Sequence, residues 1–255
     1  MSEHVRVELQ GATLAIALAR PERRNAITVA MYEALAEAIE GAAGDPSIRL
    51  IRLSGDGQDF TAGNDLADFL NALPRDLADI PVWRMLRALA ACETPILAQV
   101  QGNCVGIGTT ILLHCDLAVA EEGAHFSLPF VDLGLVPEAA SSLLLPRLAG
   151  RRAAARHLLL AEPFGPDEAL AMGLISHRAE AGQLAARADG IAAALLAKPA
   201  EALSQTQKLL RAGTREEILE RMELEGQAFA ERLQSQEVKD SIAAFFAARA
   251  AKGAA

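Results

Sequence analysis

Aromatic side chains are scarce in this chain. Only 4% of the 255 residues are aromatic, with one Trp and one Tyr, whereas 51% are hydrophobic. The interior must therefore be built from alanine and branched aliphatic side chains, which requires closely packed helices. A chain of this length buries roughly 70 to 75% of its unfolded surface, so it has enough material for one large domain.

An excess of positive charge is also absent. The 24 Lys and Arg residues against 33 Asp and Glu residues give a net charge of -9, and the isoelectric point is near 5.1. Nucleic-acid binding depends on neutralising phosphates, so this balance excludes nucleic acid as an expected partner.

Cysteine and histidine are few, and their spacing matches no metal site. The cysteines lie in or beside apolar segments, where a thiol behaves as a small hydrophobe: Cys92, Cys104 and Cys115. Four histidines have no metal-ligand spacing: His4, His125, His157 and His177. We therefore expect no metal, and we expect structural roles for His114 and Asp116 at the start of a strand.

Long hydrophobic runs are missing as well. Residues 1–7 contain no apolar signal region, and no run elsewhere is long enough to span a bilayer. We therefore expect no membrane partner and a cytoplasmic location.

The pattern that is present is an alternation of strands and helices. Strands are expected at residues 5–9, 13–19, 50–53, 96–100 and 117–120, and helices after Thr28 and over residues 82–91. This order indicates an α/β fold. From residue 150 onward the chain is expected to be almost wholly helical, and a break at Lys198 and Pro199 divides residues 1–198 from residues 199–255.

Residues 134–142, GLVPEAASS, place a single carboxylate among apolar and small side chains. The flanking residues 126–131 and 143–148 have a buried pattern, so Glu138 is expected to be partly desolvated. Desolvation makes a carboxylate more basic, as proton abstraction requires. Alternatively, Glu138 follows Pro137 as an ordinary glutamate at a helix start. This segment alone leaves both interpretations open.

Two upstream loops have the composition of ligand-binding turns. Residues 60–66, FTAGNDL, lead into a helix expected to open at Asp65, and Gly63 lets the backbone approach a ligand. Residues 102–110, GNCVGIGTT, place glycines at a strand-to-helix junction, where amide donors favour an anion. The segment at residues 60–66 is equally well explained as an ordinary capped loop. The segment at residues 102–110 lacks the spacing and the lysine of a nucleotide-binding fingerprint.

Taken together, these segments resemble the enoyl-CoA hydratase/isomerase, or crotonase, superfamily. The similarity runs from RPERRNAI at residues 20–27 to DSIAAFF at residues 240–246. It implies an α/β spiral of ββα turns over residues 1–198 and a helical trimerisation region over residues 199–255. The resemblance therefore implies a homotrimer or a dimer of trimers.

The resemblance also implies an acyl-CoA substrate and a set of site residues. The thioester carbonyl would lie between the backbone amides of Asn64 and Ile107, which would stabilise an enolate by roughly 2.7 to 4 kcal/mol each. The CoA is part of the substrate, so no separate cofactor is expected. The substrate-binding positions implied by the family are Arg23, Arg24, Ala26, Ala62, Gly63, Asp65, Leu66 and Gly106.

The departures from the hydratase pattern indicate which reaction is run. Hydratases of the family use two glutamates, and the matching positions here hold Thr110 and Phe130, neither of which can serve as an acid or base. Glu138 stands where the delta3,delta2-enoyl-CoA isomerases carry their single base. The expected activity is therefore conversion of 3-enoyl-CoA to trans-2-enoyl-CoA. An enoyl-CoA hydratase, an isomerase of aryl-CoA rings and a non-catalytic acyl-CoA-binding module remain alternatives.

Overall fold

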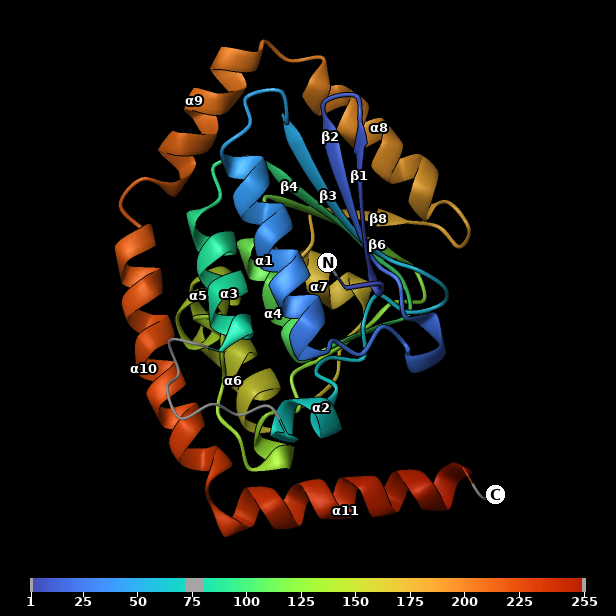
Figure 1. Ribbon diagram of the computed structural model, residues 1–255, viewed down its shortest axis with the longest axis vertical. Helices are drawn as coiled ribbons and strands as arrows, with labels where there is room; N and C mark the ends of the chain where they lie inside the picture. Colours follow the sequence, from blue (N-terminus) through green and yellow to red (C-terminus); the bar gives the residue numbers. More distant parts are fainter. Residues whose placement is uncertain (1, 72–79, 254–255) are drawn as a thin grey trace.

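The centre of the fold is a six-stranded sheet with the order β1-β2-β3-β4-β6-β8. It is seen in a computed structural model that describes residues 2–71 and 80–253 (Figure 1). The strands are β1 (Val5–Gln10), β2 (Thr13–Leu18), β3 (Leu50–Gly55), β4 (Ile96–Val100), β6 (Leu117–Glu121) and β8 (His177–Ala179). The first pair is antiparallel, with Val5 opposite Leu18, and the remaining pairs are parallel.

Helices cover both faces of this sheet, because parallel strands require crossover connections. Helix α1 (Val29–Ala43) begins after Thr28, whose hydroxyl accepts the amide of Met31 at 3.3 Å. Met31, Leu35 and Ile39 form its buried face, as the periodicity predicts, and α3 (Pro81–Ala91) packs beside it. Helix α8 (Leu184–Leu196) packs on the opposite face against β3, β4 and β6.

Three short strands were not anticipated from the sequence. Strands β5 (Asn103–Val105) and β7 (His125–Ser127) pair in parallel as a second sheet, and β8 extends the main sheet beyond β6. Each is three residues long. Such a segment is too short to show an alternation of apolar and polar side chains. Among the described residues after residue 150, β8 is the exception in a chain that is otherwise helical, as predicted.

The connecting helices of the core are short. They are α2 (Leu66–Asn71), α4 (Ile107–Ile111), α5 (Ser141–Ala149), α6 (Arg151–Leu159) and α7 (Pro166–Met172), with the 3-10 helices η1 (Pro21–Arg23), η3 (Leu112–His114) and η4 (Val131–Leu133). The strand-to-helix junction expected over residues 102–110 is present, but β5 precedes the helix.

Three helices at the carboxyl end run around the outside of the core (Figure 1): α9 (Ala200–Arg211), α10 (Arg215–Leu233) and α11 (Gln236–Gly253). Helix α10 lies against α3 and α5, and it buries Met222, Phe229 and Leu233. Helices α8 and α9 are separated at residues 197–199, where the sequence predicts a break.

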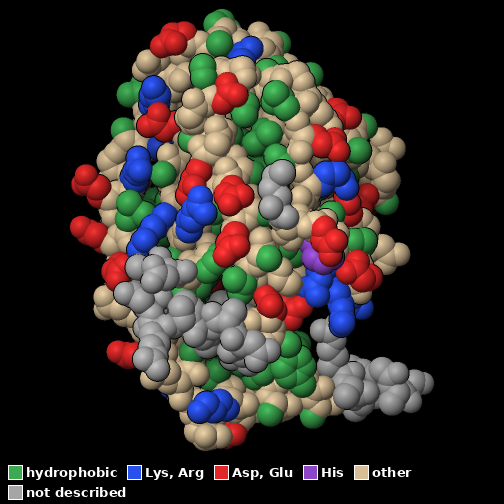
Figure 2. Space-filling model, in the orientation of Figure 1, with side chains coloured by type: hydrophobic (Ala, Val, Ile, Leu, Met, Phe, Trp, Pro, Cys, Tyr) green, Lys and Arg blue, Asp and Glu red, His purple; other side chains and the backbone are tan. Residues whose placement is uncertain are grey.

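Acidic and basic side chains are mixed over the face shown in Figure 2. That face carries no continuous basic stripe of the kind that binds nucleic acid. No helix within residues 2–71 and 80–253 combines the length and apolar character needed to cross a membrane.

Candidate active site

A cleft of about 720 Å³ opens between the core and the last helices. Its walls come from the loop before α2, the start of α4, the segment at residues 129–135, and helices α10 and α11. Most of the predicted site residues line it: Arg23, Ala26, Ala62, Gly63, Asn64, Asp65, Leu66, Gly106 and Ile107. Arg24 and Glu138 do not.

Two backbone amides in this cleft are left without an acceptor in the described chain. Ile27 forms backbone hydrogen bonds to the two residues on either side of Asn64. Its amide donates to the carbonyl oxygen of Gly63 at 2.8 Å, and its carbonyl oxygen accepts from the amide of Asp65 at 2.9 Å. The amide nitrogen of Asn64 meets no acceptor among residues 2–71 and 80–253, and neither does that of Ile107, the first residue of α4. Such amides can donate to a ligand oxygen.

The two amide-bearing loops are fixed against each other. The amide of Thr61 donates to Asn103 at 3.0 Å, and the amide of Val105 donates back to Thr61 at 3.1 Å. Gly63 has a φ of 89° and a Cβ there would lie 3.0 Å from the carbonyl oxygen of Val105. Only glycine combines that backbone conformation with so close an approach.

Tyr32, the only tyrosine of the chain, was missed by sequence reasoning. It lies fully inside on α1, and its hydroxyl donates to the side-chain oxygen of Asn64. Burial raises the pKa of Tyr32 well above its usual value, with the nearby Glu138 as a second cause. The phenol therefore remains a donor and ties helix α1 to the cleft. The scarcity of tyrosine was the signal that could have drawn attention to it.

The helix expected to open at Asp65 does so. Asp65 accepts the amide of Asp68 at 3.3 Å at the start of α2 and pairs with Arg20 at 2.8 Å. Burial opposes ionisation of Asp65, but the hydrogen bond and positive charge of Arg20 and the hydrogen bonds from the backbone of Asp68 and Ala67 together lower its pKa. Asp65 is therefore a charged structural group that holds the loop.

The three arginines of the 20–24 segment face different ways. Arg20 is paired with Asp65, whereas Arg23 lines the cleft. The side chain of Arg24 is 65% exposed and lies 3.9 Å from Asp59. Arg24 has a φ of 52°, and this left-handed turn directs it away from the cleft. The sequence could not separate Arg23 from Arg24, because the turn is set by the tertiary structure.

Glu138 lies in a turn with an unusual backbone. Ala139 and Ala140 have φ angles of 60° and 56°, and α5 begins only at Ser141. A left-handed conformation costs about 1 to 2 kcal/mol for a residue with a Cβ. The surrounding structure must therefore hold this turn in place.

The carboxyl group of Glu138 is buried, with 7% of the residue exposed. Burial raises the pKa of Glu138 to about 8, and the negative charge of Glu225 adds to this effect. Its Oε1 atom has no hydrogen-bond partner among the described residues. A carboxyl group in this state exchanges a proton near neutral pH.

The burial of Glu138 arises only partly from the flanking segments predicted to be buried. Phe126, Leu128 and Phe130 are buried, but Val131 is 38% exposed and Leu148 is 45% exposed. The prediction of burial is wrong at Val131 and Leu148, because η4 and α5 each expose one face to solvent. Remote elements complete the enclosure of the turn.

Two of those remote contacts come from η3 and α10. The His114 ring lies 2.8 Å from the carbonyl oxygen of Ala139, and Glu225 accepts the amides of Ala140 and Ser142 at 2.6 and 2.8 Å. Burial lowers the pKa of His114 to about 4, so this ring is neutral. His114 has the structural role expected for it. Glu225 was not identified from the sequence.

Thr110 and Phe130 stand at the positions that the resemblance assigns to the hydratase acids, and neither side chain carries an acid or base. The hydroxyl of Thr110 donates to the carbonyl oxygen of Ile107 at 3.2 Å, inside α4. Phe130 forms part of the cleft wall. Asp65 and Asp132 are the carboxylates among the described lining residues of the cleft.

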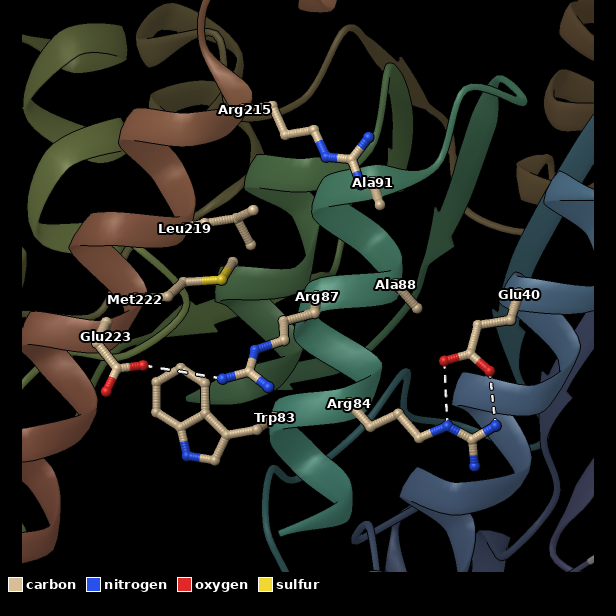
Figure 3. Close-up of a pocket in the computed structure, with 10 residues that line it drawn as sticks. All are labelled: Glu40, Trp83, Arg84, Arg87, Ala88, Ala91, Arg215, Leu219, Met222 and Glu223. Carbon is tan, nitrogen blue, oxygen red and sulfur yellow. Dashed lines mark hydrogen bonds and ion pairs between the residues drawn. The ribbon is translucent and has the colours of Figure 1, made fainter. Parts of the chain in front are cut away.

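A second cleft, of about 560 Å³, lies between α3 and α10 (Figure 3). Figure 3 shows Arg84 directed toward Glu40, which it contacts at 2.6 Å, and Arg87 directed toward Glu223 at 3.8 Å. None of the predicted site residues lines it. In the described chain, no group of three or more His, Cys, Asp or Glu side chains is arranged to hold a metal ion.

The stability of the protein should respond to pH through Glu138. Its pKa rises from 4.5 to about 8 on folding, so the folded state holds an extra proton between these values and loses stability as pH increases. Glu138→Gln removes this penalty. The variant should exceed the wild type in unfolding free energy by more at about pH 9 than at about pH 5, measured by urea unfolding. Equal differences at both pH values would contradict the raised pKa.

Comparison with known proteins agrees with this architecture. A family model described as enoyl-CoA hydratase/isomerase matches residues 8–252. A crystal structure of an enoyl-CoA hydratase/isomerase from Pseudoalteromonas atlantica has a TM-score of 0.91 and 40% identity, and covers 96% of this chain and 97% of that chain.

Two curated relatives match over nearly their full lengths. A probable enoyl-CoA hydratase of Rhodobacter capsulatus is 32% identical over 98% of this chain and 97% of its own length. The 1,2-epoxyphenylacetyl-CoA isomerase of Escherichia coli is 29% identical over the same shares. The spiral α/β fold with its cleft therefore has the arrangement of known crotonases, and the chain belongs to the enoyl-CoA hydratase/isomerase family.

Proposed function

We propose that this protein is an acyl-CoA isomerase that converts 3-enoyl-CoA to trans-2-enoyl-CoA. The observation that carries the proposal is the buried carboxyl group of Glu138, whose pKa is raised to about 8. Asn64 and Ile107 supply two amides for the thioester oxygen in the adjoining cleft. CoA enters as part of the substrate, so the proposal includes no separate cofactor.

The reaction needs only a group that moves a proton and hydrogen-bond donors that stabilise the negative charge of an enolate oxygen. In its ionised form Glu138 takes a proton from C2, and the electron pair moves into the thioester carbonyl to give an enolate. The amides of Asn64 and Ile107 donate to that oxygen. As the carbonyl reforms, the double bond moves to C2–C3 and Glu138 returns the proton to C4. One carboxyl group can therefore serve as both base and acid.

Glu138 is connected to the cleft although it does not line it. Tyr32 is close enough to Glu138 for the carboxylate charge to raise its pKa, and its hydroxyl bonds to Asn64 on the cleft wall. Tyr32 is therefore electrostatically near the proposed base and hydrogen-bonded to Asn64 of the proposed oxyanion site. Apolar lining residues near them, including Leu135 and Phe130, would exclude water from an enolate.

Water addition is the second function to test, because the Rhodobacter capsulatus relative is described as a probable enoyl-CoA hydratase. Because the Escherichia coli relative is described as a 1,2-epoxyphenylacetyl-CoA isomerase, isomerisation of an aryl-CoA substrate is a further alternative. Against hydration, Thr110 and Phe130 provide no second acid or base.

One experiment separates the alternatives. Purified protein is incubated in parallel with 3-hexenoyl-CoA and with crotonyl-CoA, and the absorbance of the conjugated thioester is followed. Isomerase activity forms that chromophore from the first substrate, whereas hydratase activity removes it from the second. Tight binding of both esters without turnover would instead identify a binding module. No turnover of 3-hexenoyl-CoA would contradict the proposed reaction.

Arg23 should contribute to binding of the CoA phosphates. The chain is acidic overall, so it must supply local positive charge to a polyanionic ligand. Arg23→Ala should raise the dissociation constant of an acyl-CoA several-fold and flatten its dependence on salt, as measured by calorimetry at low and moderate ionic strength. Arg24→Ala is the comparison variant, because Arg24 points toward Asp59 and should have a smaller effect. An unchanged dissociation constant in Arg23→Ala at both salt concentrations would remove this residue from the site.

A further inference from the structure

The turn that carries Glu138 is held by a carboxylate from a distant helix. Glu225 lies on α10, and its two oxygens accept the amide of Ala140 at 2.6 Å and the amide of Ser142 at 2.8 Å. Ala140 is the residue that precedes α5, and it cannot cap the helix with its own side chain. Glu225 therefore caps α5 from outside, as a negative charge at a helix start is well placed to do.

Glu225 is itself buried, with 6% of the residue exposed. Burial raises the pKa of Glu225, and the hydrogen bonds from Ser142 and Ala140 and the charge of Arg221 act in the opposite direction. Glu138, by contrast, has an oxygen with no partner in the described chain. When only one of the two carboxyl groups is ionised, the charge is therefore favoured on Glu225.

The groups that face this pair come from four elements. Helix α1 contributes Tyr32, and η3 contributes His114 through the carbonyl of Ala139. Helix α10 contributes Glu225 and also Arg221, which donates to the hydroxyl of Ser142 at 3.2 Å. The fourth element is the turn itself, with Glu138. Among these groups, Glu225 is the one that places negative charge near Glu138.

We propose that Glu225 is a positioning residue for the reaction, which holds the Glu138 turn from α10 and keeps a negative charge beside the base. This inference rests on the proposed function. It gives α10 a part in the chemistry beyond packing against α3 and α5. Any change that moves α10 would then change both the place and the basicity of Glu138.

The experiment is a titration of Glu138 by carbon NMR in protein labelled at glutamate side-chain carboxyl carbons. The Glu138 signal is assigned by its loss in Glu138→Gln. In Glu225→Gln, which keeps size but removes the charge, the midpoint of Glu138 should fall by about one pH unit or more. Glu223→Gln, an exposed neighbour on the same helix, is the matched control and should leave the midpoint unchanged. An unchanged midpoint in Glu225→Gln would overturn the proposal.

A second variant tests the positioning role separately from the charge. Glu225→Asp keeps the charge but is shorter, so exchange of the Ala140 and Ser142 amide protons should become faster. Turnover of 3-hexenoyl-CoA should drop at least about tenfold, with KM within about threefold of the wild type. If the Ala140 and Ser142 amide protons of Glu225→Asp exchange at the wild-type rates, the positioning role is overturned. This test does not depend on whether Glu225→Gln folds. The titration and the exchange measurement need no substrate, so they remain decisive if the wild type proves not to be an isomerase.

Discussion

Glu138→Gln is expected to lower turnover of 3-hexenoyl-CoA at least about 100-fold while leaving acyl-CoA binding nearly unchanged. General acid/base groups typically contribute roughly 100-fold to 10,000-fold, and glutamine keeps the shape of the side chain without its proton chemistry. The wild-type rate should also rise with pH up to about 8, the pKa of Glu138, because only the ionised form removes the proton. Steady-state kinetics and calorimetry measure the two effects.

Asp132→Asn provides the matched control for this experiment. Asp132 lines the cleft directly, unlike Glu138, and the other carboxylate of the described cleft lining, Asp65, is paired with Arg20. It should retain activity within a few-fold of the wild type. If Asp132→Asn abolishes turnover and Glu138→Gln does not, the base has been assigned to the wrong carboxylate.

Gly108→Val is expected to reduce turnover by at least about 100-fold. A Cβ at residue 108 would lie 2.4 Å from the side-chain methyl carbon of Thr61, inside the contact between the two amide-bearing loops. The start of α4 must then move, and with it the amide of Ile107. Loss of one oxyanion donor typically costs about 100-fold to 1,000-fold in turnover. Kinetics with 3-hexenoyl-CoA, together with a thermal melt to verify folding, measure the effect.

Ile107→Val is the companion variant, because it changes the side chain and keeps the backbone amide. It should retain nearly full turnover, since the loss of one methylene from a buried position costs only about 0.5 to 1.5 kcal/mol of stability. Equal activity in the two variants would show that the glycine junction does not shape the site. A folded Gly108→Val protein with wild-type turnover would contradict the role of the Ile107 amide.

Much of the fold follows from local pattern. The strands at residues 5–10, 13–18, 50–55, 96–100 and 117–121 and the helix after Thr28 agree with the apolar periodicity. The short strands β5, β7 and β8 do not, because their pairing comes from neighbours distant in the sequence.

The expected trimer or dimer of trimers and the division at residue 198 remain predictions, and light scattering would test the assembly.

In the candidate site, too, some residues were indicated by local sequence pattern and others only by the tertiary structure. The resemblance to the crotonase family indicated Asn64 and Ile107, and the glycines and helix starts of their loops are local signals that the chain displays. Tyr32 and Glu225 left no such signal. Each reaches the site from a helix far away in the sequence, Glu225 across 85 residues to Ala140. Phe245 and Phe246, which belong to the region that the resemblance assigns to trimerisation, line the cleft of their own chain.

The sequence by itself determined the family and the α/β order, and it is the source of the proposal that Glu138 is the base. These depend on residue identity and on short-range periodicity, which a linear chain displays directly. Only the tertiary structure decided that Arg23 and not Arg24 faces the cleft, that Ala139 and Ala140 are left-handed, and that Glu138 is enclosed by a remote carboxylate. The physical reason is that burial and electrostatic environment are sums over neighbours in space, and folding brings those neighbours together from distant parts of the chain.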